Sequence, residues 1–244
     1  MYCVGKSMLM QYIAHQAVEQ DRVVLLLTLE MGSDPVFRRL DALETHIPVK
    51  AIKDFDLSEG EVDQWRAGAE RAKSRKGDII VFDNLGEISV GEVWRWAERY
   101  RPDLIVIDYI NLMKSTLPNS AASWEKIAQV TRELKRMTNS LQVPVLAAAQ
   151  TNADGATKGG DVTTVGYSRT IVQDSDICLG IHRTDEMKAN RQMEVRLSKN
   201  RDGKNVVVQM LWDLDTMTIR EWDTSDDIVA AFGGTKAVIT EEAG

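Results

Sequence analysis

The sequence predicts an α/β domain with a mostly parallel central sheet, helices on both faces of that sheet, and antiparallel strands at the carboxy-terminal end. Short apolar runs alternate with segments of helical spacing along most of the chain, which is the pattern of an α/β fold. The runs Val23–Leu29 and Leu104–Ile107 are almost continuously apolar, which is typical of parallel strands buried on both faces. The last strand patterns follow one another, and the later ones favour antiparallel hairpins.

The individual elements follow from local patterns. Residues 7–20 have apolar side chains at helical spacing. Pro35 suits the first turn of a helix over residues 35–45, and Ser58 with Glu61 forms a capping box that opens a polar helix over 58–75. Similar patterns predict helices at 89–100 and 122–141 and strands at 79–82, 143–149, 177–181, 193–197, 206–211 and 218–221. Residues 151–170 are rich in glycine and threonine and structureless by pattern.

Length and composition favour one large domain with a loose end. The chain has 244 residues, of which 43% are hydrophobic and 27% are charged, enough for a sizeable core. We expect a domain over residues 1–223 and a flexible acidic tail over 224–244. Cys3 and Cys178 show no pairing pattern, and the sequence has no signal peptide or membrane span, so we expect a cytoplasmic protein. The net charge of −7 neither favours nor excludes nucleic-acid binding, for which a few local cations can suffice.

The chain opens on the second half of a phosphate-binding loop, Val4-Gly5-Lys6-Ser7-Met8. The full loop reads Gly-x-x-x-x-Gly-Lys-Ser/Thr, so its first glycine falls one residue before Met1. We expect that the nucleotide site is cut at its start, either because the natural chain begins upstream or because the frame is misassigned. In an intact loop the lysine reaches the β- and γ-phosphates and the serine hydroxyl ligates Mg²⁺. The alternative is an ordinary helix start with a solvated lysine.

Two carboxylates follow apolar strand patterns, at the strand ends where open parallel sheets bind ligands. Glu30 follows the first strand and can orient or deprotonate the water that attacks a γ-phosphate, with a helix cap as the alternative. Asp108 closes the run Leu104–Ile107 and suits a Mg²⁺-side acid, with a turn cap as the alternative. Together with Lys6 and Ser7, these residues predict an ATPase that uses ATP and Mg²⁺.

Two further strand ends carry polar candidates. Gln150 ends the strand at 143–149 with an amide that can sense a γ-phosphate. Lys199 and Arg201 lie at a strand end before a hairpin, where an arginine can stabilise transition-state charge on its own nucleotide or a neighbour's. A strand-end glutamine and a basic turn before Asp-Gly are both common without a function. These candidates therefore gain weight only from the whole pattern.

The motifs occur in the order found in one family. The sequence resembles the carboxy-terminal ATPase domain of DnaB-type replicative helicases, and the resemblance covers nearly the whole chain. It rests on five segments in order, namely Leu29-Glu30-Met31, Ile107–Met113, Ala149–Asn152, Gln173–Asp176 and Lys199–Gly203. The fold that this resemblance implies is a RecA-like P-loop NTPase core that lacks its first strand.

The resemblance implies a role for each candidate. Glu30 would activate water, Asp108 would hold Mg²⁺, Gln150 would sense the γ-phosphate, and Arg201 with Lys199 would reach the adjacent subunit's site. The implied assembly is a hexameric ring that translocates on single-stranded DNA, in a bacterial cytoplasm or a phage-infected cell, with a primase or helicase loader as partner. The implied DNA-facing loops are 114–121 and 151–170, with candidate contacts at Lys114, Asn119, Lys158, Gly159 and Arg169.

Two alternatives stay open at this point. A RadA-like or RecA-like recombination ATPase shares a Lys-Asn-Arg motif, but such proteins usually add an amino-terminal zinc module and a carboxy-terminal protease-like domain. A truncated paralogue that binds helicase subunits or DNA without turnover would explain the cut loop, but the retained Glu30, Asp108, Gln150 and Arg201 argue against it. The absent first glycine puts autonomous ATP binding in question, and the absent amino-terminal domain and linker helix put ring assembly in question.

Overall fold

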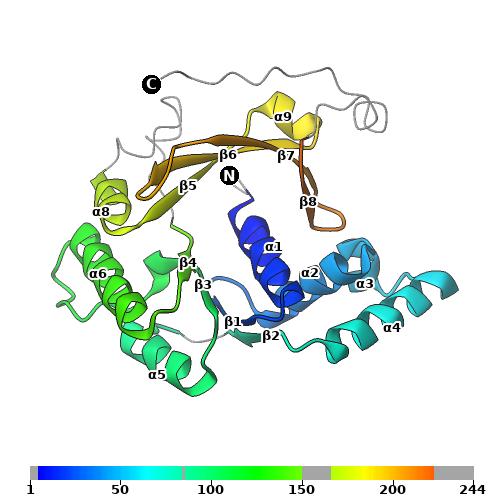
Figure 1. Ribbon diagram of the computed structural model, residues 1–244, viewed down its shortest axis with the longest axis horizontal. Helices are drawn as coiled ribbons and strands as arrows, with labels where there is room; N and C mark the ends of the chain where they lie inside the picture. The colour runs from blue at the N-terminus through cyan, green and yellow to red at the C-terminus, as the bar shows by residue number, and fades with distance from the viewer. Residues whose placement is uncertain (1–4, 84–85, 150–165, 223–244) are drawn as a thin grey trace.

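The chain folds into two four-stranded sheets with helix α1 (Lys6–Glu19) between them, as Figure 1 shows. This computed structural model describes residues 5–83, 86–149 and 166–222, with the backbone alone for 166–169. The first sheet is parallel in the order β2-β1-β3-β4, and the second is antiparallel in the order β5-β6-β7-β8. The strands are β1 Val23–Thr28, β2 Asp78–Phe82, β3 Leu104–Asp108, β4 Val145–Ala147, β5 Ile177–His182, β6 Gln192–Asn200, β7 Val207–Asp213 and β8 Thr218–Glu221. The predicted α/β class is confirmed, and the antiparallel strands form a sheet of their own.

Helices cover both faces of the parallel sheet. α1 and α2 (Ser33–Thr45) pack on one face, and α5 (Val90–Tyr100) and α6 (Ser123–Leu141) pack on the other. These four helices confirm the predictions from periodicity. α4 (Glu59–Ser74) is also confirmed, and its capping box forms between Ser58 and Glu61 as expected. Within the described ranges, no helix is long and apolar enough to cross a lipid bilayer.

Three helices depart from the predictions. α3 (Val49–Asp54) and α9 (Asp185–Ala189) were not predicted, because each is too short for periodicity to reveal. α8 (Gly166–Asp174) begins inside the segment 151–170 that was expected to be structureless, so that expectation is wrong for residues 166–170. α8 is held by tertiary contacts that outweigh weak local propensity, since Ile171 packs on the core and the Thr131 hydroxyl of α6 donates to Asp174 Oδ2 at 3.2 Å.

The pairing of β1 with β3 sets the carboxyl edge of the parallel sheet. Thr28 pairs with Asp108, and the Leu29 N–H donates a hydrogen bond to the Asp108 carbonyl at 2.8 Å. β2 and β4 flank this pair in parallel register. The carboxyl ends of all four strands therefore meet at one edge, which is where open parallel sheets bind their ligands.

Helix α1 is packed on two sides. Met8 and Leu9 belong to a core that includes Trp212 and other buried residues of the antiparallel sheet. Met10 and Ala14 belong to a second core with residues of β1 and β3. Both sheets therefore fix the position of the helix that begins at the phosphate loop.

A cluster of ion pairs joins α1, α2 and the end of α4. Arg75 Nη1 lies 2.6 Å from Glu44 Oε2, and Arg71 Nε lies 3.0 Å from Glu44 Oε1. His15 Nε2 of α1 lies 3.3 Å from Glu44 Oε2, and Arg75 also pairs with Glu19 of α1. Burial alone would raise the pKa of the Glu44 carboxyl, but the hydrogen bond and charge of Arg75, with hydrogen bonds from His15 and Arg71, outweigh it and lower that pKa.

Replacing Glu44 with glutamine should lower the free energy of unfolding by roughly 1–3 kcal/mol near neutral pH. Because the folded-state pKa is depressed, the Glu44 charge stabilises the fold above the unfolded-state value of 4.5 and loses this effect as pH falls through the folded-state pKa. Urea unfolding should thus show a difference in unfolding free energy between wild type and E44Q that is largest at neutral pH and disappears in acid. Glu70→Gln, which removes an exposed pair with Lys73, is the control and should change stability little. A difference that does not change with pH would contradict the argument.

Candidate nucleotide-binding site

The phosphate-loop residues open α1 at the carboxyl edge of the parallel sheet. Gly5 directly precedes the helix with a φ of +93°, a left-handed conformation that glycine adopts at no steric cost. A Cβ atom at Gly5 would lie 2.1 Å from Cζ3 of Trp212 on β7. The backbone conformation and the close approach of the tryptophan ring both require glycine at this position.

The Lys6 side chain lies at the strand ends. Its Nζ donates a hydrogen bond to the Ala149 carbonyl at 3.0 Å, just beyond the end of β4. Burial lowers the pKa of the Lys6 ammonium, and the negative charges of Asp108 and Glu30 oppose that shift. Both carboxylates therefore lie close enough to act on this ammonium. An ammonium carries three N–H donors, and the bond to Ala149 uses one of them.

Glu30 and Asp108 come from neighbouring strands and share their surroundings. Asp108 is half-buried at the end of β3, and Glu30 is exposed two residues beyond the end of β1. Burial raises the pKa of the Tyr109 hydroxyl, and the charges of Glu30 and Asp108 raise it further. The structure thus brings Lys6, Glu30 and Asp108 to one place.

Of the other residues predicted at the nucleotide site, the structure describes Ser7 and Met8. Ser7 is half-buried in the first turn of α1. The Met8 side chain is buried in the core, which leaves its backbone to face a ligand. Val4 and Gln150 lie outside the described residues. The residue before Gln150 nevertheless supplies the carbonyl that accepts the hydrogen bond from Lys6.

Lys199 lies near the end of β6 and Arg201 directly follows that strand; Lys199 contacts α8, which Figure 1 shows apart from the start of α1. Arg201 Nη1 is 3.1 Å from Asp176 Oδ1, and Lys135 of α6 binds the other oxygen of Asp176. The hydrogen bond from Lys135, its charge and the contact with Arg201 lower the pKa of Asp176. The Lys199 ammonium donates to three carbonyls at the end of α8 and just beyond it, those of Val172 (2.7 Å), Gln173 (3.0 Å) and Ser175 (2.6 Å).

Residues 114–121, a predicted DNA-facing loop, run from η1 (Ile110–Leu112) to α6 with Lys114 and Asn119 exposed. Gln129 of α6 anchors this segment, because its Oε1 accepts hydrogen bonds from the Ser115 hydroxyl at 2.6 Å and the Thr116 N–H at 3.1 Å. These hydrogen bonds therefore fix Ser115 and Thr116 of the loop to α6. The remaining predicted DNA contacts lie outside the described atoms, namely Lys158, Gly159 and the side chain of Arg169.

Sequence reasoning missed two residues behind the phosphate loop. The guanidinium carbon of Arg183 lies 3.5 Å from the centroid of the Trp212 ring, and the same ring approaches Gly5. Burial lowers the pKa of Arg183. The Trp212 ring therefore contacts both the Arg183 cation and Gly5. No local pattern signals this arrangement, because it joins residues far apart in the chain.

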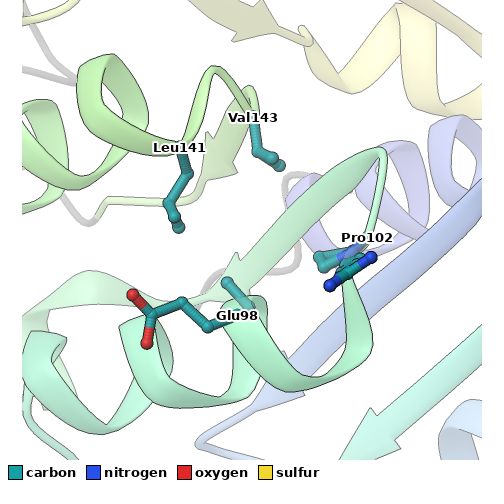
Figure 2. A pocket seen from close by; sticks show the side chains of 6 residues that line it. Glu98, Pro102, Leu141 and Val143 are labelled. Atoms are coloured by element: carbon teal, nitrogen blue, oxygen red, sulfur yellow. The ribbon is translucent and has the colours of Figure 1, made fainter.

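A separate hollow of about 520 Å³ lies at the opposite edge of the parallel sheet (Figure 2). Pro102 and Val143 of its lining come just before β3 and β4 begin, and Glu98 and Leu141 come from the last turns of α5 and α6. Open parallel sheets bind ligands at the carboxyl ends of their strands. This hollow is therefore distinct from the candidate nucleotide-binding site.

Comparison with known proteins identifies the family. The DnaB-like helicase C-terminal domain model matches residues 2–221. The replicative DNA helicase DnaC of Bacillus subtilis (strain 168) is 26% identical over 213 residues, covering 82% of this chain and 46% of the relative. A probable plasmid replicative DNA helicase of Chlamydia trachomatis is 27% identical over 206 residues, covering 82% of this chain and 44% of the relative. The chain thus spans about half the length of the curated relatives it matches.

Solved structures have the same fold. One solved ATPase domain matches with a TM-score of 0.81 at 24% identity, covering 91% of this chain and 82% of that one. A DnaB-like replicative helicase, studied with its interactions with primase, matches with a TM-score of 0.78 at 24% identity, covering 89% of this chain and 56% of that one. The two sheets and their helices form a RecA-like α/β domain. With the family model matched from residue 2 to residue 221, this chain belongs to the DnaB-like helicase C-terminal domain family.

Proposed function

We propose that this chain is the ATPase motor of a replicative DNA helicase, which hydrolyses ATP to translocate on single-stranded DNA and unwind duplex as a hexameric ring. The observation that carries the proposal is the meeting of Lys6, Glu30 and Asp108 at the carboxyl edge of the parallel sheet. Family membership favours a helicase over a recombination ATPase, and the curated relatives are replicative helicases.

Each residue at this edge has a distinct task in hydrolysis. The free N–H groups at the start of α1 and the Lys6 ammonium bind the β- and γ-phosphates, and the Ala149 carbonyl holds that ammonium over the strand ends. Glu30 orients the attacking water and accepts its proton. The exposed position of Glu30 suits this task, because its carboxylate must reach a water outside the fold. Gln150, directly after the Lys6 contact, is proposed to sense the γ-phosphate.

Mg²⁺ fits the donor set at this edge. The Ser7 hydroxyl and the Asp108 carboxylate offer the hard oxygen ligands that Mg²⁺ prefers. Mg²⁺ bound there would supply positive charge that neutralises the phosphates. Ser7 on α1 and Asp108 on β3 are held relative to each other by the packing of that helix on that strand.

Arg201, with Lys199 beside it, is proposed to act on the nucleotide of a neighbouring subunit. Both residues lie at the end of β6 beside α8, apart from the group around Lys6. The Arg201 side chain is 64% exposed, so it can extend toward another subunit. Ring assembly would then complete each site with a cation from the next subunit.

Single-stranded DNA is proposed to bind the segments that follow Asp108 and Gln150. Lys114 and Asn119 are exposed on the first segment, where Gln129 fixes the backbone. With few cations on these segments, we expect a shallow dependence of DNA affinity on salt. The second segment, residues 151–170, contributes Lys158, Gly159 and Arg169 as proposed DNA contacts.

A primase or a helicase loader is proposed as the protein partner, and the cytoplasm of a bacterium or of a phage-infected cell as the location.

The chain should hydrolyse ATP faster when single-stranded DNA is present, and Lys6→Ala should lower this turnover at least about 100-fold by removing the phosphate-binding cation. Steady-state phosphate release measures both. Lys73→Ala on α4 is the control, because it removes a lysine that is 72% exposed and paired only locally. Turnover that survives in K6A would contradict the assignment. If wild type itself is inactive, the assay is repeated on a variant extended to carry a complete Gly-x-x-x-x-Gly-Lys-Ser loop, and continued inactivity would favour a non-catalytic partner.

Arg201→Ala and Glu30→Ala should each abolish hydrolysis, and mixing the two proteins should restore it. In a mixed ring, an intact Glu30 meets an intact Arg201 from its neighbour at roughly a quarter of the interfaces, so about that fraction of the wild-type rate is expected. Rate measurements on a 1:1 mixture test this. Recovery should be absent when either variant is mixed with a protein that carries both substitutions. Loss of nucleotide binding in R201A alone would instead place Arg201 in its own subunit's site.

Lys199→Met should lower the free energy of unfolding by about 1–3 kcal/mol, because it removes three hydrogen bonds to carbonyls at the end of α8. Amide hydrogen exchange should become faster in α8, and urea unfolding should give the change in stability. Arg201→Ala is the matched comparison and should change stability little, because its pair with Asp176 is exposed. Unchanged stability with lost hydrolysis in K199M would make Lys199 a purely catalytic group.

A further inference from the structure

Several hydrogen bonds hold the loop that carries Glu30: Arg39 Nη1 donates to Met31 Sδ at 3.6 Å, and three others involve the backbone of the loop or of Ser33 just after it. Just before Glu30, the Leu29 N–H donates to the Asp108 carbonyl at 2.8 Å. The Thr28 hydroxyl donates to the Met31 carbonyl, also at 2.8 Å, and closes the turn around Glu30. The third bond fixes the far end of the loop, where α2 begins.

That third bond comes from another strand. α2 begins at Ser33, and its N-cap residue, Gly32, has no side chain to bind the free N–H groups of the first turn. Asp83, directly after β2, takes that place: its Oδ2 accepts the Ser33 N–H at 2.7 Å. Hydrogen bonds from the Ser33 N–H and hydroxyl lower the pKa of the Asp83 carboxyl. A carboxylate at a helix start is also stabilised by the helix dipole.

We propose that Asp83 is a positioning residue for Glu30, which acts by fixing the start of α2 and with it the loop from Leu29 to Gly32. The inference rests on the proposed function, because it takes Glu30 as the group that orients water. β2 pairs with β1 along Val23–Leu27, so the end of β2 is rigidly placed beside the loop. Asp83 transmits that placement to the far end of the loop through its hydrogen bonds with Ser33.

The exposure of Glu30 makes this support necessary. Its side chain is not packed in a core, so its carboxylate is placed mainly by the backbone that carries it. A shift of about 1 Å in a reacting group can lower a rate by roughly 100-fold. Freeing the start of α2 is the kind of change that would allow such a shift without disturbing Lys6, which belongs to a different helix.

The kinetic test compares three variants of the full chain in single-stranded-DNA-stimulated ATP hydrolysis. Asp83→Ala should lower kcat by about 10- to 100-fold while KM for ATP changes less than about 2-fold, because nucleotide binding depends on α1 and not on α2. Asp83→Asn keeps an acceptor oxygen and should recover most of the turnover. Ser58→Ala is the matched control, because it breaks the capping box of α4, a helix that carries no proposed site residue.

A double-mutant cycle tests whether Asp83 acts through Glu30. In an E30Q background, adding Asp83→Ala should leave the residual single-turnover rate unchanged, because the group that Asp83 positions is already lost. An equal fractional loss in both backgrounds would overturn the inference and give Asp83 a separate role. An unchanged kcat in D83A, with an active wild type, would overturn it as well.

Hydrogen exchange gives a readout that does not need turnover. Amides of residues 29–33 should exchange faster in D83A than in wild type, D83N or S58A, because the Ser33 N–H loses its acceptor. Unchanged exchange in D83A would overturn the inference. If the protein lacks turnover even with a complete phosphate loop while exchange responds as expected, the proposed function fails and the placement of the Glu30 loop by Asp83 stands.

Discussion

The pairing of β1 with β3 is the contact on which the candidate site depends. Both strands are apolar on both faces, so alternation of side chains cannot set their register. Their polar ends do so instead. Aligning Thr28 with Asp108 brings the first polar groups after each run to the same edge, where the Leu29 N–H meets the Asp108 carbonyl. A slipped register would draw a carboxylate into the apolar core, which is costly. The core therefore selects the pairing that sets Glu30 beside Asp108.

The start of α1 links the two sheets at that edge. Lys6 contacts the parallel sheet through the Ala149 carbonyl, and Gly5 lies against Trp212 of the antiparallel sheet. The Arg183 guanidinium packs over the same Trp212 ring. The start of α1 is thus bounded by a carbonyl and two carboxylates on one side and by an aromatic ring with its cation on the other. This asymmetry orients the Lys6 ammonium toward the acidic strand ends.

The fold could largely be predicted from the sequence, because most of its helices are long enough to show a period and its buried parallel strands form short apolar runs. α3 and α9 were missed since five or six residues carry none, and α8 was missed because contacts with α6 hold it. Lys6, Glu30 and Asp108, which the structure brings together, could be proposed from the sequence because each follows a recognisable strand or loop. Asp83 and Trp212 were not, since their contacts with Ser33 and Gly5 join distant segments. The Lys199 contacts with α8 were hidden for the same reason.

The double burial of α1 has a consequence for how the sequence can change during evolution. Met8 and Leu9 pack in one hydrophobic core, and Met10 and Ala14 pack in another. Most positions of α1 are therefore constrained by neighbours on opposite sides of the helix. A compensating substitution would have to satisfy both sheets at once. α4 is the opposite case, because Gly68 is the single buried residue along its length. Among related chains, α1 should therefore drift slowly and α4 quickly, even at positions that touch no ligand.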